Sequence, residues 1–387
     1  MGSIRERLEA EERGRLAPYA MASADSRGRA APEPEHPYRT RFQRDRDRIV
    51  HATAFRRLEH KTQVLLNAHG DHYRTRLTHT LEAAQIARTL GRGLGLNEDL
   101  IEAVALAHDL GHAPFGHAGG EALDGCLREH GGFEHNRQSL RVVELLERRH
   151  PEVRGLNLTY EVQESVIKHG LEEDRRPPEL ERYRPEEGPL LEAQVVDVAD
   201  GLAYLAHDCD DAVRFGLLTP EELCASALWR RAQQAAAQRH GTLGERDLAV
   251  KAAVRRLLDL AVTDVLETTR ARLAERGIDS VAAVRASRGY LVGPSAALAA
   301  ELAELKAFLF ERYYRHWRVM RMVRKAQQVV VRLFEAFVAE PRTLPQRWQA
   351  WCEQAGRERA VADYIAGMTD RYAQREYRRL FEPFALP

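Results

Sequence analysis

Residues 97–117 read NEDLIEAVALAHDLGHAPFGH, and they describe a helix that leads into a glycine-rich turn crowded with polar side chains. Asn97 is suited to cap the helix N-terminus, and the two acids that follow it lie where the helix dipole favours negative charge. Gly111 is a typical helix stop. The pattern therefore predicts a helix over 97–109 that ends on the dipeptide His108-Asp109.

Working outward, the same periodicity continues through most of the chain. Apolar residues recur at spacings of three and four, whereas alternating runs of β-branched and aromatic residues bounded by Asn-Gly or Asp-Gly turns are missing. We expect further helices over 78–94 and 189–209. The sequence predicts an all-α protein.

The chain is predicted to have three parts. Residues 1–48 form a charged, partly irregular arm, because the prolines between positions 32 and 37 exclude a helix interior there. Residues 49–215 form a helical core, and residues 216–387 form a helical extension that packs on it. No internal repeat is present.

Composition limits the classes of partner. The 387 residues carry 58 cationic and 58 acidic side chains, and this balance favours neither nucleic acid nor an anionic membrane as the main partner. The four cysteines are too far apart for a zinc knuckle or a thioredoxin motif, which fits a reducing cytoplasm. The N-terminus is too charged for a signal peptide, and no run of about 18 apolar residues occurs. We expect a cytoplasmic protein without membrane spans.

The dipeptide His108-Asp109 ends a helix whose other inward positions are apolar. A buried carboxylate beside an imidazole is costly unless something pairs with it, and a divalent metal would do so. Alternatively, the two side chains only cap the helix and hydrogen-bond. His79, on the apolar face of the helix over 78–94, can likewise be a ligand or a satisfied core residue.

The helix over 189–209 is strongly apolar and yet carries one polar stripe. The stripe consists of Asp197, Asp200, Tyr204 and Asp208, at spacings of three and four. A solvated face would explain the acids. It explains poorly why a tyrosine lies among them on a helix that otherwise looks buried.

Taken together, His79, His108-Asp109 and Asp200 resemble the H…HD…D metal signature of the HD-domain phosphohydrolase superfamily. Residues 43–49 (QRDRDRI) and 55–64 (FRRLEHKTQV) are similar to the N-terminal signature of bacterial deoxyguanosinetriphosphate triphosphohydrolase-like proteins. Without the resemblance, these two stretches would be interpreted as solvated, arginine-rich helix. The similarity is strong from about residue 25 to 215, and Tyr314-Arg315-His316 and Leu333-Phe334 give a weaker echo of the family.

The resemblance implies an HD-domain fold and a metal-dependent reaction. In this family the whole triphosphate is removed from a deoxynucleoside triphosphate (dNTP), which gives a deoxynucleoside and tripolyphosphate. The implied ligands of a divalent ion of the manganese, magnesium, iron or zinc class are His79, His108, Asp109 and Asp200. Relatives commonly form homo-oligomers, so a homo-oligomer is expected.

The resemblance also assigns roles around the metal. His112 would contact phosphate and His117 would donate the proton to the leaving group, whereas the role of His135 as acid, base or orienting group stays open. The implied substrate contacts are Arg76 with the α-phosphate, Gln63 with the 3′ hydroxyl, Tyr204 and Asp208 with the deoxyribose, and Arg315 with the distal phosphates. For Arg315 and the cationic run that follows it, a solvated face is the alternative.

Two positions depart from the family pattern. Many relatives have an acidic residue at the position of Gly120, three residues after His117, and an acid or a lysine at the position of Gly201, next to Asp200. These departures affect the expected rate and the phosphate contacts more than the metal.

Two other functions fit parts of the sequence. The first is an HD-type phosphomonoesterase or phosphodiesterase that acts on nucleotides with fewer phosphates. The second is a non-catalytic protein that binds a nucleotide or single-stranded nucleic acid through the arginine-rich segment 39–57. The zero net charge and the predicted acid–base histidines favour the dNTP triphosphohydrolase.

Overall fold

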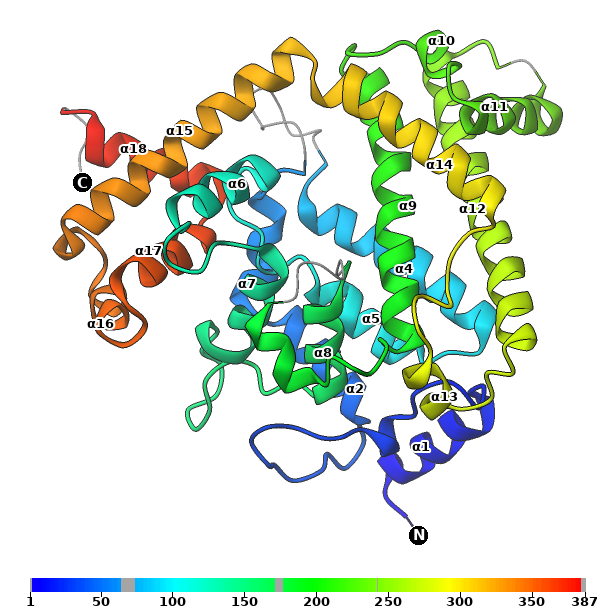
Figure 1. The fold of residues 1–387 in the computed structure, drawn as a ribbon, viewed down its shortest axis with the longest axis horizontal. Helices are drawn as coiled ribbons and strands as arrows, with labels where there is room; N and C mark the ends of the chain where they lie inside the picture. The colour runs from blue at the N-terminus through cyan, green and yellow to red at the C-terminus, as the bar shows by residue number, and fades with distance from the viewer. Residues whose placement is uncertain (1, 64–73, 171–176, 242, 384–387) are drawn as a thin grey trace. The chain divides into compact units, whose positions relative to one another are not determined.

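The computed structural model describes residues 2–63, 74–170, 177–241 and 243–383, so Val64, the last residue of the N-terminal signature, lies outside the described residues. The described parts are α-helices joined by turns and short 3-10 or π segments, and their only β-type pairings are isolated bridges (Figure 1). The predicted all-α fold is confirmed. In the same parts of the chain, no helix has an apolar stretch of the length needed to cross a bilayer.

Contacts between residues divide the chain into two compact units that are interleaved along the sequence. Unit 1 comprises residues 1–25, 82–102 and 185–320, and unit 2 comprises residues 26–81, 103–184 and 321–387. Helices α4 (Arg76–Leu94), α5 (Glu98–Ala107) and α15 (Trp317–Ala339) each contribute residues to both units. The predicted division into arm, core and extension stays a prediction.

Unit 1 is built around two long helices, α9 (Leu191–Arg214) and α12 (Arg246–Glu275), which pack on each other. Figure 1 shows α12 in yellow-green beside α11, which it also contacts. The other α-helices that lie wholly in this unit are α1 (Ile4–Arg15), α10 (Pro220–Leu223), α11 (Ala227–His240), α13 (Val281–Ala286) and α14 (Ala296–Leu309). The predicted arm thus contains a regular helix, α1, whose N-terminus is closed by a capping box between Ser3 and Glu6.

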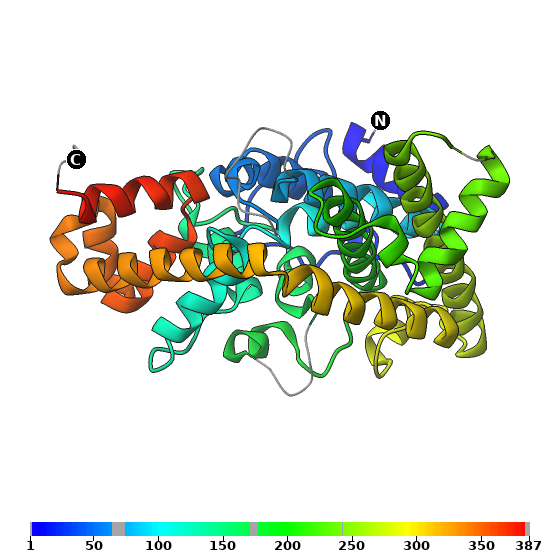
Figure 2. The same ribbon diagram turned by 90° about the horizontal axis from the view of Figure 1, so that it is seen from above.

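Unit 2 has one apolar core, in which α6, α15, α17 and α18 meet through residues such as Leu123, Phe334 and Ile365. In Figures 1 and 2 the orange and red C-terminal helices gather around the far end of α15. The α-helices that lie wholly in this unit are α2 (Arg41–Val50), α3 (Thr53–Arg57), α6 (Gly116–Cys126), α7 (His135–Arg141), α8 (Tyr160–Lys168), α16 (Gln346–Ala355), α17 (Arg357–Ala366) and α18 (Asp370–Phe381).

The sequence located the helices well and their ends less well. The predicted cap is present, because the side-chain oxygen of Asn97 accepts hydrogen bonds from the main-chain amides at positions 99 and 100. However, α5 ends at Ala107, two residues earlier than predicted, so His108 and Asp109 lie in the turn that follows it. Helix α9 extends five residues beyond the predicted end.

The arginine-rich helix α2 is not simply a solvated face. Asp45 on this helix is fully buried, pairs with Arg29 and accepts hydrogen bonds from the main chain and the hydroxyl of Thr159. Arg48 donates to Glu33 at 2.7 Å and to two main-chain carbonyls. The charges of α2 therefore attach the segments around residues 29–33 and 156–159 to the rest of unit 2.

Buried Glu192 in α9 gives a pH-dependent prediction for stability. Its Oε1 accepts from the amides of Met21 and Asn97, and its Oε2 has no hydrogen-bond partner in the described part of the chain. Burial raises the pKa of Glu192 from 4.5 to about 7. A carboxyl group whose pKa is raised by folding stabilises the folded protein fully at pH values below its unfolded-state pKa. This stabilisation is lost as the pH rises through the folded-state pKa of about 7. At pH 8, Glu192→Gln should therefore unfold with a free energy about 3 kcal/mol higher than the parent.

Urea unfolding of both proteins between pH 4 and pH 8 tests this prediction. The introduced glutamine can keep both main-chain hydrogen bonds through its single oxygen, so the two proteins should be equally stable at pH 4. Glu304→Gln, a change at an exposed position of α14, is the matched control. An equal pH slope for Glu192→Gln and the parent would contradict the prediction.

Candidate metal centre and active site

Three predicted metal ligands meet in unit 2. His79 lies in the first turn of α4, and His108 and Asp109 follow α5; all three are buried. Each offers one ligand atom, and these three atoms lie within 4.8 Å of one another. Two imidazoles and a carboxylate at this spacing can hold one divalent ion.

The ring of His108 is oriented by the last turn of α5, which precedes it. Its Nδ1 lies 2.6 Å from the carbonyl oxygen of Ala105, and because a carbonyl only accepts, Nδ1 carries the proton. Its Nε2 is then the nitrogen with the lone pair, and it lies 3.4 Å from Oδ1 of Asp109. A hydrogen bond on one ring nitrogen that leaves the other for the metal is usual for histidine ligands.

Asp109 is held in the ionised form that a metal requires. Burial opposes ionisation, but the guanidinium charge of Arg76 and the hydrogen bond from His112 hold the pKa of Asp109 well below its usual range. Oδ2 of Asp109 accepts from Arg76 at 3.0 Å, and Oδ1 lies 3.1 Å from Nε2 of His112. The donor set therefore fits a divalent cation in type, and its carboxylate is in the ionised form that binds one.

Arg76 has donors to spare at this place. Its guanidinium is buried, and NH1 binds Asp109, whereas Nε and NH2 have no hydrogen-bond partner among the described residues. Buried donors of a charged group are costly to leave unsatisfied. A phosphate oxygen would satisfy them, as predicted for Arg76.

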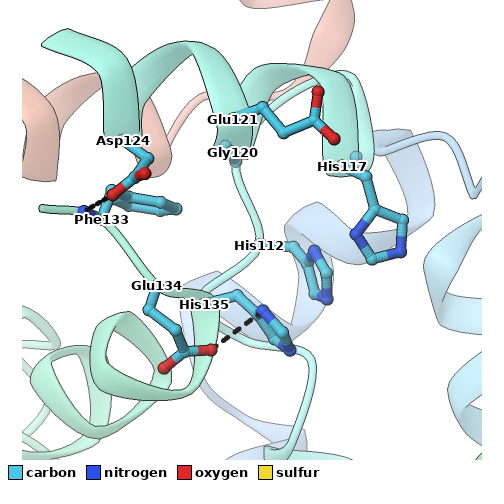
Figure 3. Close-up of a pocket in the computed structure, with 10 residues that line it drawn as sticks. His112, His117, Gly120, Glu121, Asp124, Phe133, Glu134 and His135 are labelled. Carbon is cyan, nitrogen blue, oxygen red and sulfur yellow. Dashed lines mark hydrogen bonds and ion pairs between the residues drawn. The ribbon is translucent and has the colours of Figure 1, made fainter. Parts of the chain in front are cut away.

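The three predicted catalytic histidines line one cavity of about 200 Å³ in unit 2. Figure 3 shows His112, His117 and His135 facing this cavity from the turn after α5, from α6 and from α7. The rings of His112 and His135 are stacked with centroids 4.3 Å apart, and that of His117 stands edge-on to His112 at 5.6 Å. The structure thus brings the three histidines together, and their catalytic roles stay predictions.

The cavity histidines differ in exposure. Burial lowers the pKa of His112 well below its usual value, and Arg76 adds to the effect, so His112 is neutral near pH 7. Burial also lowers the pKa of His135, whose Nδ1 lies 3.0 Å from Glu134. His117 is exposed to solvent. Because ionised Asp109 only accepts, Nε2 of neutral His112 carries the single ring proton and donates it in a hydrogen bond to Oδ1 of Asp109.

A glycine allows the helix of His135 to come this close. A Cβ atom on Gly111 would overlap the main chain of His135 and Ser139 in α7, so a larger residue would displace this helix. The amide of Gly111 donates to the hydroxyl of Ser139 at 2.8 Å, and that hydroxyl donates to the carbonyl of His108 at 2.7 Å. The glycine that ended the predicted helix thus also fixes the distance between His112 and His135.

The turn after His112 has an unusual backbone that brings it against two other predicted site residues. Phe115 and Gly116 both have positive φ, 65° and 60°, which is strained for phenylalanine. A Cβ on Gly116 would lie 3.1 Å from the carbonyl oxygen of Gln63 and 3.4 Å from NH2 of Arg76. Gln63 is buried, and its Oε1 has no partner in the described part of the chain. Gln63 and Arg76 therefore both border this turn.

The departure at Gly120 leaves room beside His117. A Cβ on Gly120 would meet only the edge of the Phe133 ring, at the ordinary contact distance of 3.8 Å. Glu121 lines the same cavity (Figure 3) and accepts from Gln327 at 3.2 Å. Its carboxylate is the nearest acid in sequence to the one that the family pattern leads us to expect.

The other predicted site residues belong to unit 1. Asp200 is half-buried on α9. One turn later on the same helix, Tyr204 stacks on Tyr314 with ring centroids 6.1 Å apart. Two turns after Asp200, buried Asp208 accepts a hydrogen bond from the Tyr314 hydroxyl. Arg315 is exposed and pairs with Glu311 at 2.9 Å. The roles of Asp200, Tyr204, Asp208 and Arg315 stay predictions.

Sequence reasoning missed three buried residues near the centre. The His169 ring lies 5.1 Å from that of His108, and both residues offer ligand atoms within 4.8 Å of each other. The Lys61 ammonium donates to the main-chain carbonyls of His112 and Ala366. Asp370, at the start of α18, accepts from the amide and hydroxyl of Thr62 and, at 2.7 Å, from the amide of Phe115. Only the Lys61 segment lies in a motif that could have drawn attention to it.

Comparisons with known proteins agree with this geometry. The HD domain model matches residues 76–205, and the phosphohydrolase-associated domain model matches residues 292–379. The chain is 50% identical over 368 residues to a deoxyguanosinetriphosphate triphosphohydrolase-like protein of Thiobacillus denitrificans, covering 95% of this chain and 97% of the relative. A protein of the same name from Geobacter sulfurreducens is 47% identical over 379 residues, covering 98% of each chain.

HD domains use a bound metal to hydrolyse phosphate esters, and the buried cluster of His79, His108 and Asp109 supplies suitable ligands for one here. The identity to the two relatives extends over almost the whole of each chain. The chain therefore belongs to the deoxyguanosinetriphosphate triphosphohydrolase-like family and is a metal-dependent phosphohydrolase.

Proposed function

We propose that this protein hydrolyses deoxynucleoside triphosphates to a deoxynucleoside and tripolyphosphate. The observation that carries the proposal is the buried guanidinium of Arg76, which has spare donors beside the His79, His108 and Asp109 cluster. A site with cation ligands and an unsatisfied buried guanidinium side by side suits a phosphoryl group. The names of the relatives, deoxyguanosinetriphosphate triphosphohydrolase-like proteins, support a triphosphate substrate.

The residues of the chain divide the work of the reaction between them. A divalent ion, when bound by His79, His108 and Asp109 with Asp200 as the predicted fourth ligand, supplies an acidified water and neutralises charge on phosphate. Arg76 binds an oxygen of the α-phosphate and holds the phosphorus for attack by water on the side opposite the 5′ oxygen.

Histidines complete the transfer. Neutral His112 donates from Nε2 to Asp109 and holds that carboxylate beside the metal site, and exposed His117 gives a proton to the departing 5′ oxygen. His135, stacked on His112, keeps that ring in place. The water oxygen stays on the α-phosphorus of the tripolyphosphate, and the deoxynucleoside leaves with its 5′ hydroxyl restored.

A product assay tests this reaction. Purified protein is incubated with each of the four dNTPs and with manganese, magnesium, iron or zinc ions, and the products are separated. We expect deoxynucleoside and tripolyphosphate in equal amounts. The matching ribonucleoside triphosphates should be hydrolysed much more slowly than the dNTPs.

Each rival function predicts a different result. Orthophosphate would favour the phosphomonoesterase alternative. Oligonucleotide binding that weakens with salt, without turnover of any dNTP under any metal, would favour the non-catalytic alternative.

A further inference from the structure

A second cavity in unit 2, of about 310 Å³, shares no residue with the histidine cavity. It lies between the arginine-rich face of α2 and the loop after the π segment at 142–146. Its lining consists of Arg39, Arg44, Asp47, Arg48, His51, Arg149, His150 and Leu156. The lining thus carries four guanidiniums and two imidazoles against one carboxylate.

Neighbouring acids do not balance these charges. Arg44 and Arg48 share the carboxylate of Glu33, at 3.2 and 2.7 Å, and Arg29 also pairs with that carboxylate. Arg29 has a second partner in Asp45, and Arg39 pairs with Asp47 at 2.7 Å. Arg44 and Arg48 therefore share one carboxylate, that of Glu33, and Glu33 also pairs with Arg29.

Three lining side chains have donors that nothing in the described part of the chain occupies. Arg149, His51 and His150 make no side-chain hydrogen bond or ion pair within the described residues. Arg149 and His150 come from the loop and His51 from the end of α2, so the unused groups border the cavity from both of its sides.

The crowding of cations adds to the lowered pKa of two lining groups. Burial lowers the pKa of His150, and Arg48, Arg149 and Arg44 lower it further, while only Glu33 opposes them. Burial likewise lowers the pKa of Arg44, and Arg29 and Arg48 add to the effect against Glu33 and Glu35. An anion in the cavity would reverse these effects by screening the cations from one another.

We propose that this basic cavity is a binding site for an oligophosphate chain, either free or as the phosphates of a nucleotide. Guanidinium groups match phosphate oxygens in pairs, and unpaired arginine and histidine donors on two sides can contact successive phosphates. The lining contains no phenylalanine, tyrosine or tryptophan and one aliphatic side chain, Leu156, so the site recognises phosphate and not a base. The proposal is independent of the reaction at the histidine cavity.

Calorimetric titration of the full chain with sodium tripolyphosphate tests the site. A chelator is present so that tripolyphosphate cannot bind through a metal ion at the candidate metal centre. We expect Arg149→Gln to weaken the binding about tenfold, since it removes a charge-assisted contact. Arg239→Gln, at an exposed position of α11 with no described partner, is the matched control and should bind like the parent. Equal isotherms for Arg149→Gln and the parent would overturn the proposal.

A local readout separates this cavity from any other anion site. The imidazole resonance of His150, assigned by its loss in His150→Gln, should move when tripolyphosphate is added, and its pKa should rise. A resonance that stays in place would overturn the proposal even if calorimetry detects binding.

Further ligands identify the source of the phosphates. Similar affinities for tripolyphosphate and a dNTP, with no binding of the deoxynucleoside, would support recognition through the phosphates. Binding of a single-stranded oligonucleotide but not of tripolyphosphate would assign the surface to a nucleic-acid backbone and contradict the proposal.

Discussion

Asp109→Asn is expected to lose the bound metal and, with it, at least about a thousandfold of kcat/KM, which corresponds to about 4 kcal/mol of lost transition-state stabilisation. The carboxylate of Asp109 is the only negative charge in the buried trio with His79 and His108. The substitution keeps the shape of the side chain but removes that charge. Metal content and dNTP turnover measured on the same preparation test the prediction.

The choice of asparagine matters because Asp109 also pairs with buried Arg76. An alanine would leave the guanidinium buried without a partner, at a cost of about 3–5 kcal/mol, and could unfold the protein. An asparagine can still accept from Arg76, and circular dichroism will show whether the helices persist. Asp247→Asn, at an exposed position of α12, is the matched control. Full metal content in Asp109→Asn would remove Asp109 from the ligand set.

Asp370→Ala is expected to lower the free energy of unfolding by about 3 kcal/mol or more, because it leaves the buried donors of Thr62 and Phe115 without their acceptor. Activity should fall as well. Thr62 precedes Gln63, and Phe115 holds the strained turn between His112 and His117. Urea unfolding and steady-state kinetics on the same samples test both effects.

A conservative change distinguishes positioning from general instability. Oδ2 of Asp370 accepts from Thr62 and Oδ1 accepts from Phe115, so an asparagine can serve only one of the two sides. Asp370→Asn should therefore lie between the alanine variant and the parent in kcat, with metal content unchanged. An alanine variant as active as the parent at a temperature where both are folded would contradict a positioning role.

Local sequence signals predicted most of the fold. The spacing of apolar residues predicted helices at α4, α5 and α9, and Asn97 and Gly111 marked the start and the stop of the segment that carries His108. Helix ends were less accurate, since His108 and Asp109 lie in a turn whose geometry depends on Ser139 of another helix. Tertiary contacts of this kind leave no periodic signal.

The candidate site divides in the same way. The motif named His79, His108 and Asp109, whose ligand atoms lie close together in the structure, and three histidines that line one cavity. Their roles stay predictions. The sequence did not indicate a role for Asp370, because its partner Phe115 is 255 positions away. A lone aspartate at the start of a helix is first interpreted as a cap. His169 was missed for a similar reason, because it follows α8 without any motif around it.

The most direct test of the central claim is an anomalous difference map from crystals of the full chain soaked in manganese. The account predicts one strong peak at about 2 Å from a nitrogen of His79, a nitrogen of His108 and an oxygen of Asp109, and the same map checks Asp200 as fourth ligand. A manganese-replete crystal with its peak away from these three side chains, or with no peak in unit 2, would contradict it.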